Sequence, residues 1–306
     1  MRDTFPASPR PAPDRPERRP LKATLRDVVA LTKPRITLMV LITAAGGMWL
    51  APDALPLGTA LIMLITTATV VASANALNCW LERDSDRLMK RTMYRPLPDG
   101  RLQPTIALWL GVTLGVISVP LLTFAVNALT GLLGAVALIS YVAIYTPMKR
   151  TSSTALLVGS VPGALPPLMG WTAATGSLDA PGLALFAILF FWQVPHFLAI
   201  AVYRQVDYDR AGLKTLPSER GLAATKVQAI AYTGLLVVSS LLLYVFRVAG
   251  PLYLVSAIVL GALFLGAALA PTKPNENRWA RRLFIVSLVY LTLLFAVLSV
   301  DALLQS

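Results

Sequence analysis

Long runs of apolar residues with few or no charged side chains dominate this 306-residue chain. It is 56% hydrophobic and 14% charged, whereas soluble domains are about 25% charged. A membrane-spanning helix needs about 20 mostly apolar residues. Nine runs meet this requirement: 36–52, 58–80, 104–124, 126–146, 155–175, 182–203, 224–246, 250–271 and 283–303. We therefore predict an all-α, polytopic membrane protein, a bundle of about nine transmembrane helices around a central cavity open to the cytoplasmic side.

The basic residues recur at alternate connections between these runs. The chain has 27 Lys and Arg against 15 Asp and Glu, a formal net charge of +12. All of the Lys and Arg except Arg247 lie before the first run or around the connections that follow the second, fourth, sixth and eighth runs. Cytoplasmic loops carry an excess of Lys and Arg. The pattern predicts a cytoplasmic N-terminus and an external C-terminus, and it explains the basic charge without a nucleic-acid partner.

The N-terminal segment differs in composition from the rest of the chain. Residues 1–20 are rich in Pro and Arg and offer little to bury, which predicts a disordered cytoplasmic tail followed by a transmembrane domain over 21–306. Residues 21–33 could form a short interfacial helix that Pro34 would end. The single cysteine, Cys79, excludes an internal disulfide and a cysteine-based metal cage.

Asn78, Glu82 and Asp86 lie four residues apart where the second apolar run ends. On a helix this spacing places the three side chains on one face. Carboxylates are costly near a membrane and by default mark a functional site. Oxygen ligands suit a hard cation such as Mg²⁺, which often bridges to substrate phosphates. The three residues therefore predict a metal site for diphosphate chemistry.

Basic side chains follow these acids and also end the fourth run. Arg91 and Arg95 come soon after Asp86, while Lys149 and Arg150 follow Tyr145-Thr-Pro-Met. Cations mixed with carboxylates suit a phosphate bridged by a metal. The alternatives are a solvated, charge-balanced loop for the first group and an interfacial anchor for the second, and the sequence favours neither strongly over phosphate binding.

A second mixture of acids and bases follows the sixth run. It includes Arg204, Asp207 and Lys214. By itself this signal is weak. It gains weight from the first group, because two clusters at the same side of the membrane could clamp one diphosphate from both sides.

Two features within the membrane suggest a site for the second substrate. His196, the only histidine, lies near Gln193 and Pro195 in the sixth run. A lone membrane histidine is more often a satisfied packing residue, but this one could orient or ligate a bound acceptor. The fifth run carries three prolines within 161–168 and predicts a kinked or broken helix, which can line a cavity or serve close packing.

Several of these stretches together resemble the UbiA-type intramembrane prenyltransferase superfamily, and within it the branch that farnesylates haem. The likeness covers about residues 25–300. One departure is Ala211, which stands where the superfamily usually has a second Asp after Asp207. The stretches that carry the resemblance are LTKPRIT (31–37), NCWLERDSDRLMKRTMYRPLPDGRL (78–102), YTPMKR (145–150), VPGALPPLMGW (161–171), WQVPHF (192–197) and DYDRAGLKTLP (207–217).

The resemblance implies an activity and roles for the residues named above. A farnesyl group would pass from farnesyl diphosphate to the vinyl group of protohaem IX (haem B), and water would add to give haem O. Mg²⁺ would be held by Asn78, Glu82, Asp86 and Asp207, with Mn²⁺ as an alternative metal. The leaving diphosphate would be bound by Arg91, Arg95, Lys149, Arg150, Arg204 and Lys214. His196 and Gln193 would contact the haem, which is a substrate rather than a resident cofactor.

The resemblance also implies a location and partners. We expect an integral protein of the cell (inner) membrane whose partners include haem A synthase or assembly proteins of terminal oxidases. Three other functions remain open on the sequence. A prenyltransferase for an aromatic quinone precursor would share the diphosphate site, a cation-coupled transporter would use Glu82 and Asp86 as its ion site, and a haem-binding assembly protein would leave these acids unexplained.

Overall fold

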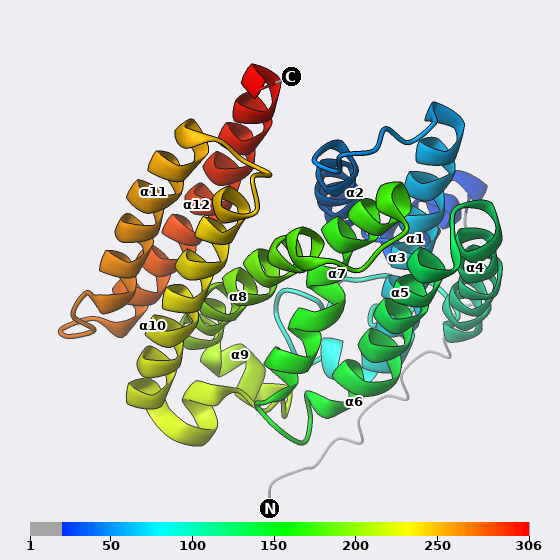
Figure 1. Ribbon diagram of the computed structural model, residues 1–306. Helices are drawn as coiled ribbons and strands as arrows, with labels where there is room; N and C mark the ends of the chain where they lie inside the picture. The colour runs from blue at the N-terminus through cyan, green and yellow to red at the C-terminus, as the bar shows by residue number, and fades with distance from the viewer. Residues whose placement is uncertain (1–19, 306) are drawn as a thin grey trace, which may run out of the picture.

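The computed structural model describes residues 20–305, and these residues form helices without any strand (Figure 1). The predicted tail over 1–20 lies outside this range except for Pro20. The elements are α1 (Leu21–Leu31), α2 (Pro34–Trp49), α3 (Leu57–Asp86), α4 (Pro104–Ala125), α5 (Ala128–Ile139), the π-helix η1 (Ser140–Tyr145), α6 (Thr146–Met148), α7 (Ala155–Thr175), α8 (Ala180–Tyr203), α9 (Gln205–Arg210), α10 (Leu216–Val245), α11 (Pro251–Leu269) and α12 (Glu276–Gln305). The all-α prediction is confirmed.

The apolar helices identify an integral membrane protein, although the count of nine spans is not confirmed. Each predicted run corresponds to one helix, or to α5, η1 and α6 together for the fourth run, and none extends past its helix by more than three residues. Seven helical segments of the described chain are long and apolar enough to cross a membrane, and the bent pair α1–α2 makes up to eight. The helix that does not meet this criterion is α7, because its Gly, Pro, Ser and Thr residues lower its hydropathy.

The interior position of α7 explains this composition. Most of its residues are buried, and it packs against α2 on one side and α8 on the other. An interior helix needs close packing with its neighbours more than an apolar surface for lipid. Of the kinked or broken helix predicted from the prolines, the break is excluded, because α7 runs continuously through Pro162, Pro166 and Pro167.

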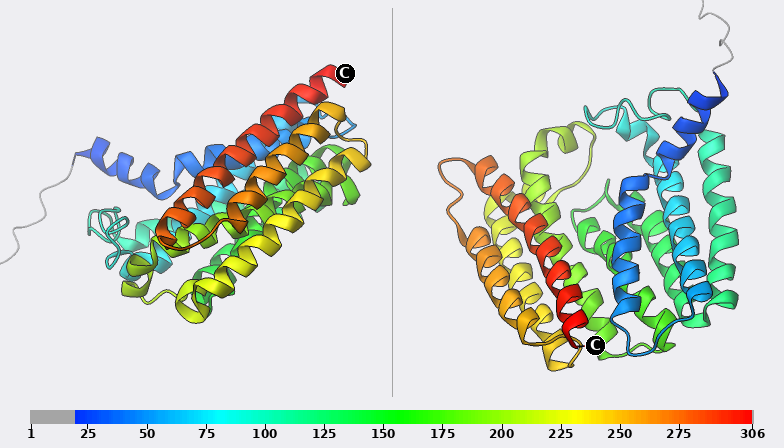
Figure 2. Two further views of the ribbon diagram at one scale, coloured as in Figure 1. Left: turned by 90° about the vertical axis from the view of Figure 1, so that its left-hand side faces the viewer. Right: turned by 90° about the horizontal axis from the view of Figure 1, so that it is seen from above.

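Two groups of helices lie on either side of the α7–α8 pair (Figures 1 and 2). In one group α3 packs on α4, and α2 on α7. In the other group α8 packs on α10 and α12, and α11 on α10 and α12. Their cores differ too, since Leu185, Tyr253 and Tyr290 belong to one buried cluster and Met63, Leu122 and Met169 to another. Residues from both halves of the chain can therefore meet at the ends of these helices.

Glycines allow α2 and α7 to touch at the backbone. A Cβ added to Gly47 would overlap the carbonyl of Pro167, and one added to Gly170 would overlap the carbonyl of Ala44. The approach is thus reciprocal, with a small residue on each helix facing main chain of the other. Close backbone contact of this kind is a common way for membrane helices to associate.

The break between α1 and α2 places Lys33 at the polar end of the bundle. As predicted, α1 is a short helix that stops before Pro34, and the two helices are bent by 45°. Lys33 takes the left-handed backbone conformation, with φ of 48°. Non-glycine residues rarely adopt this conformation, and such strain is often found at functional sites.

Candidate functional site

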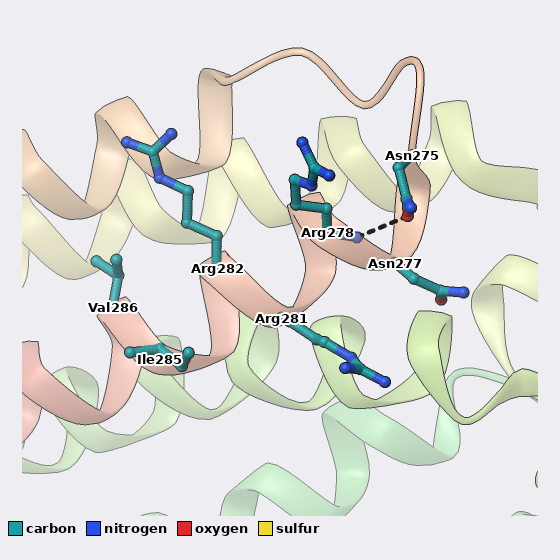
Figure 3. A pocket seen from close by; sticks show the side chains of 7 residues that line it. All are labelled: Asn275, Asn277, Arg278, Arg281, Arg282, Ile285 and Val286. Atoms are coloured by element: carbon teal, nitrogen blue, oxygen red, sulfur yellow. Dashed lines mark hydrogen bonds between the residues drawn. The ribbon is translucent and has the colours of Figure 1, made fainter.

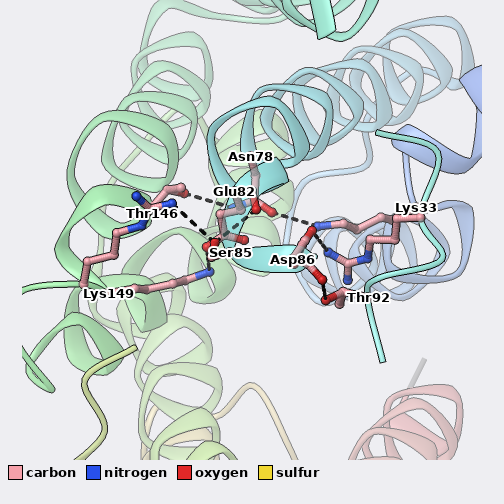
Figure 4. A network of polar contacts seen from close by, with 10 residues as sticks. Lys33, Asn78, Glu82, Ser85, Asp86, Thr92, Thr146 and Lys149 are labelled. Carbon is pink, nitrogen blue, oxygen red and sulfur yellow. Dashed lines mark hydrogen bonds and ion pairs between the residues drawn. The ribbon is translucent and has the colours of Figure 1, made fainter. Parts of the chain in front are cut away.

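Asn78, Glu82 and Asp86 lie near one another at the end of α3 (Figure 4). They contact Lys33 between α1 and α2, Arg95 after α3 and Lys149 after α6. Asn78 and Asp86 are each 1% exposed, and the Glu82 side chain is 12% exposed. All three lie on the last turns of α3, where the helix leaves the apolar interior. Buried carboxylates need partners of opposite charge, and the contacts below supply them.

Each carboxylate is paired with a predicted cation. Lys149 Nζ donates to Glu82 Oε1 at 2.7 Å, and Arg95 donates through an NH1 group to Asp86 Oδ2 at 2.7 Å. Burial alone would lower the pKa of the Lys149 ammonium, but Tyr145, Glu82 and Tyr141 around it raise that pKa above its usual value on balance. Lys149 therefore stays charged throughout the neutral range.

The amide of Asn78 is held in one orientation from both sides. Its Oδ1 accepts from Lys33 Nζ at 3.0 Å, and its Nδ2 donates to Thr146 Oγ1 at 3.2 Å. Thr146 in turn donates to the carbonyl of Tyr141 at 2.8 Å. Because the threonine hydroxyl uses its proton on that carbonyl, it can only accept from Asn78. Asn78 Oδ1 therefore faces the space between α3 and Lys33.

The sequence argument missed Lys33 and Thr146 as members of this site. Lys33 is 45 residues from Asn78, and Thr146 is 68 residues away. A usable signal was nevertheless present, since Lys33 directly precedes the proline that separates two helices and lies within the LTKPRIT stretch. Thr146 likewise belongs to the YTPMKR stretch that supplies Lys149.

The π-helix η1 brings this last stretch to α3. It spans Ser140–Tyr145 and is followed directly by α6. Single π turns occur often at functional sites. Lys149 Nζ lies 4.3 Å from the centre of the Tyr145 ring, an arrangement that permits a cation–π contact. The Lys149 ammonium thus lies against the Tyr145 ring on one side and bonds to Glu82 on another.

The donor set fits a cation held only partly by protein. Asp86 Oδ1 is buried and has no hydrogen-bond partner in the part of the chain that the structure describes. Within residues 20–305 no three Asp, Glu, His or Cys side chains converge on one point. Mg²⁺ usually binds one or two carboxylates together with water and substrate phosphates, not a cage made by protein alone. Asp86 and Glu82 meet that requirement.

The second predicted cluster lies beside the first but is not fused with it. On α9, Asp207 pairs with Arg204 at 3.6 Å and lies 4.0 Å from Arg210. Its carboxylate does not join Glu82 and Asp86 in a three-acid group within the described chain. A backbone bond of 2.8 Å from the Lys214 N–H to the Lys149 carbonyl connects the two clusters. The predicted metal role of Asp207 remains a prediction.

The other predicted basic residues are distributed around these clusters. Arg150 donates to Ser85 Oγ at 3.4 Å, on the turn of α3 between Glu82 and Asp86. Arg91 lies close enough to Tyr208 on α9 to lower the pKa of that phenol, although burial raises it more. Arg204 and Lys214 are exposed. Cations thus contact the acidic end of α3 from the segment after α3 and from the segment after α6, through Arg95, Lys149 and Arg150.

His196 and Gln193 both lie on α8 but contact different neighbours. Gln193 donates to the carbonyls of Ser160 at 3.2 Å and Leu189 at 3.0 Å, and it packs on Gly163 of α7. His196 instead contacts Ser287 of α12, with 2.8 Å between Nδ1 and Oγ. The amide of Gln193 thus links α8 to α7, and the acceptor-binding role of the two side chains remains a prediction.

A separate cavity of about 630 Å³ lies at the start of α12 (Figure 3). It shares no residue with the acidic face of α3. Arg278, Arg281 and Arg282 line it together with two asparagines and two aliphatic side chains. In Figure 3 the Arg281 side chain points away from those of Arg278 and Arg282, so the three guanidinium groups do not converge on one point.

Comparison with known proteins identifies the family and the relatives of this chain. Residues 40–294 match the UbiA prenyltransferase family. The chain is 50% identical to the protoheme IX farnesyltransferase of Myxococcus xanthus (strain DK1622), over 92% of this chain and 96% of that protein.

Solved structures of low sequence identity share the fold. A structure of digeranylgeranylglyceryl phosphate synthase matches with a TM-score of 0.79 at 17% identity, over 92% of this chain and 99% of that one. A UbiA homologue from Archaeoglobus fulgidus bound to DMAPP and Mg²⁺ matches with a TM-score of 0.61 at 20% identity, over 90% of this chain and 99% of that one.

Proposed function

Because the chain belongs to the UbiA prenyltransferase family, we propose that it moves a farnesyl group from farnesyl diphosphate to a vinyl group of haem B, with addition of water, to make haem O. The choice of haem as acceptor follows from the protoheme IX farnesyltransferases to which it is about 50% identical over most of its length. The observation that supports the prenyl-transfer chemistry is the buried acidic face of α3, where Asp86 Oδ1 has no hydrogen-bond partner within the described residues.

The charges around this face suit a diphosphate and a metal together. Lys33, Arg95 and Lys149 are three cations in contact with Asn78, Asp86 and Glu82. The two carboxylates would hold Mg²⁺, with Asn78 Oδ1 available if Lys33 turns toward the substrate. Mg²⁺ would neutralise diphosphate oxygens as charge develops on them. The A. fulgidus homologue bound to DMAPP and Mg²⁺ supports the use of a divalent metal, and Mn²⁺ would serve the same oxygen ligands.

The side chains of the site would act mainly on the leaving group. The bond between C1 of the farnesyl chain and the diphosphate oxygen breaks, and the diphosphate departs with the electron pair. Lys33, Arg95 and Lys149 stabilise the charge that appears on it, which is the kind of interaction that lowers a barrier. The vinyl double bond then supplies electrons to C1, and water attacks the resulting cation and loses a proton.

The neighbouring residues complete the proposed machinery. Asp207 would be an additional metal ligand, and Arg91, Arg150, Arg204 and Lys214 would bind diphosphate oxygens. The diphosphate would connect a metal at Asp207 to the acidic face of α3, because Asp207 does not form a three-acid group with Glu82 and Asp86 within the described chain. His196 and Gln193 would lie on the side of the acceptor, with His196 the direct contact.

The same proposal includes the placement of the protein. The protein would reside in the cell (inner) membrane with its N-terminus and the acidic face of α3 on the cytoplasmic side. This follows from the alternation of basic residues between the predicted runs. Haem A synthase or oxidase assembly proteins would receive the product.

One assay tests the proposal as a whole. Membranes that contain the protein are supplied with haem B, farnesyl diphosphate and Mg²⁺, and the extracted haems are separated and weighed by mass spectrometry. We expect a new haem heavier by one farnesyl group and one water, absent when EDTA is added. Unmodified haem with folded protein would reject the haem acceptor, and farnesylation of an aromatic acid in the same membranes would replace it with a quinone precursor.

A further inference from the structure

The ring of His196 is fixed on several sides by aromatic neighbours. Trp192 stacks on it with centroids 4.6 Å apart and planes 24° apart, and Phe284 of α12 lies 4.8 Å away at 33°. Phe197 approaches at 5.4 Å with its plane at 70°. Trp192 is itself tied to α12, because its Nε1 donates to the carbonyl of Ser287 at 2.7 Å. The imidazole therefore has one plane and little freedom to rotate.

The contacts of Ser287 determine which nitrogen of His196 carries the proton. Ser287 Oγ lies 2.6 Å from the carbonyl oxygen of Phe284 and 2.8 Å from His196 Nδ1. Two oxygens 2.6 Å apart need a proton between them, and a carbonyl cannot supply it. The serine therefore donates to Phe284 and must accept from the histidine. This assigns the proton to Nδ1 and leaves a lone pair on Nε2.

The lone pair on Nε2 has no hydrogen-bond partner among residues 20–305. His196 makes no other hydrogen bond within the described chain, yet Nε2 is not among the enclosed atoms that lack one. His196 is also 8% exposed, so some of its surface reaches open space. A packing histidine would be expected to use both nitrogens. In His196, Nδ1 is held by Ser287, whereas Nε2 is available to bind a ligand.

We propose that Ser287 is a positioning residue that holds His196 as the Nδ1–H tautomer, so that Nε2 binds the iron of the haem acceptor. This proposal rests on the proposed function, which makes haem the substrate. Neutral imidazole is a common ligand for iron, and its second nitrogen is usually fixed by a hydrogen bond that also strengthens the ligand. Bond formation requires only that the Nε2 lone pair enter an open axial position, with no change in oxidation state.

The test measures ligation directly, without prenyl diphosphate. The purified full-length protein is loaded with ferrous haem B, and resonance Raman spectra are searched for the iron–histidine stretching band. We expect the band in the unaltered protein and none in His196→Ala. Ser287→Ala should lower the band frequency and weaken haem binding about tenfold or more, the usual effect of losing the partner of a ligating histidine. Ser287→Thr should retain both properties.

Ser239→Ala provides a matched control. Ser239 is a buried serine whose hydroxyl donates only to a carbonyl of its own helix, that of Leu235 at 2.8 Å. Its replacement should leave the band and the haem affinity unchanged. An iron–histidine band that survives His196→Ala, or one that Ser287→Ala and Ser239→Ala affect equally, would overturn the proposal, as would haem that does not bind.

The outcome is separable from that of the proposed function. Haem O formed by a protein without an iron–histidine band would refute the ligation and leave the activity standing. A band without any farnesylated haem would establish ligation and refute the transferase. Both measurements use the same preparation, so a folding defect would appear in both.

Discussion

Replacement of Asp86 by Asn removes one negative charge from the acidic face of α3 and tests the effect of that charge alone. The two side chains have the same size, and Asn can still accept from Arg95, which donates to Asp86 Oδ2 at 2.7 Å. The buried Oδ1 has no partner whose loss would add a further penalty. Because Arg95 is 31% exposed and can be solvated, we expect a loss of only about 1–2 kcal/mol in the free energy of unfolding.

The effect on turnover should be much larger than the effect on stability. If Asp86 holds the metal that neutralises the leaving diphosphate, its removal eliminates a stabilisation of about 3–4 kcal/mol specific to the transition state. At 1.36 kcal/mol for each factor of ten, this corresponds to a rate about 100- to 1000-fold lower. The assay is the initial rate of haem O formation at saturating farnesyl diphosphate. Excess Mg²⁺ should restore part of the rate.

A neighbouring carboxylate supplies the control. Asp84 is 62% exposed and pairs loosely with Arg83 at 3.7 Å and Arg87 at 3.9 Å. Asp84→Asn changes the net charge of the same segment by the same amount without touching the buried face. Its rate should remain near that of the unaltered protein. If Asp86→Asn also remained within about threefold of normal, which is less than 1 kcal/mol, the metal assignment would be wrong.

Three further predictions follow from individual contacts. Lys33→Met should raise the KM for farnesyl diphosphate more than the KM for haem, because it removes a cation beside Asn78; equal effects in steady-state kinetics would contradict this. Arg281→Gln should leave haem binding in a titration unchanged, because Arg281 lies about 120° around α12 from Ser287; a weakened affinity would instead place the haem propionates at the start of α12. Gly47→Ala should lower the melting temperature, since its Cβ would overlap the main chain of Pro167 and overpacking costs about 1–3 kcal/mol, whereas Gly58→Ala, which meets no neighbour, should not.

The parts of the site that lie on one helix were predictable from sequence. Asn78, Glu82 and Asp86 follow a four-residue spacing, and a helix converts that spacing into one face whatever surrounds it. Their pairing with Arg95 and Lys149 follows from the need to neutralise buried charge. The sequence supplied more cations than the acids could bind, however, and nothing local indicated that Lys149 would pair with Glu82 while Arg204 would pair with Asp207.

Contacts between distant segments were not predictable in the same way. Gln193 and His196 are three residues apart, which suggested one polar pocket. They differ by about 60° around the helix, and with α7 and α12 packed on α8 this difference directs them to separate neighbours. The prolines of α7 were misleading for a related reason. Packing in a crowded interior kept that helix continuous where an isolated segment would be expected to break.

The π turn shows why helical periodicity alone could not place Lys149. A π turn holds one residue more than an α turn, so each residue after it is displaced by about 100° from its position on an ideal α-helix. Extrapolation from α5 through Ser140–Tyr145 would therefore direct Thr146 and Lys149 away from the face they occupy. The observed register brings Thr146 to Asn78 and Lys149 to Glu82, two bonds that hold α3 and α6 in one arrangement. The irregular turn is thus part of the site, because without it the main cation for the buried Glu82 would point elsewhere.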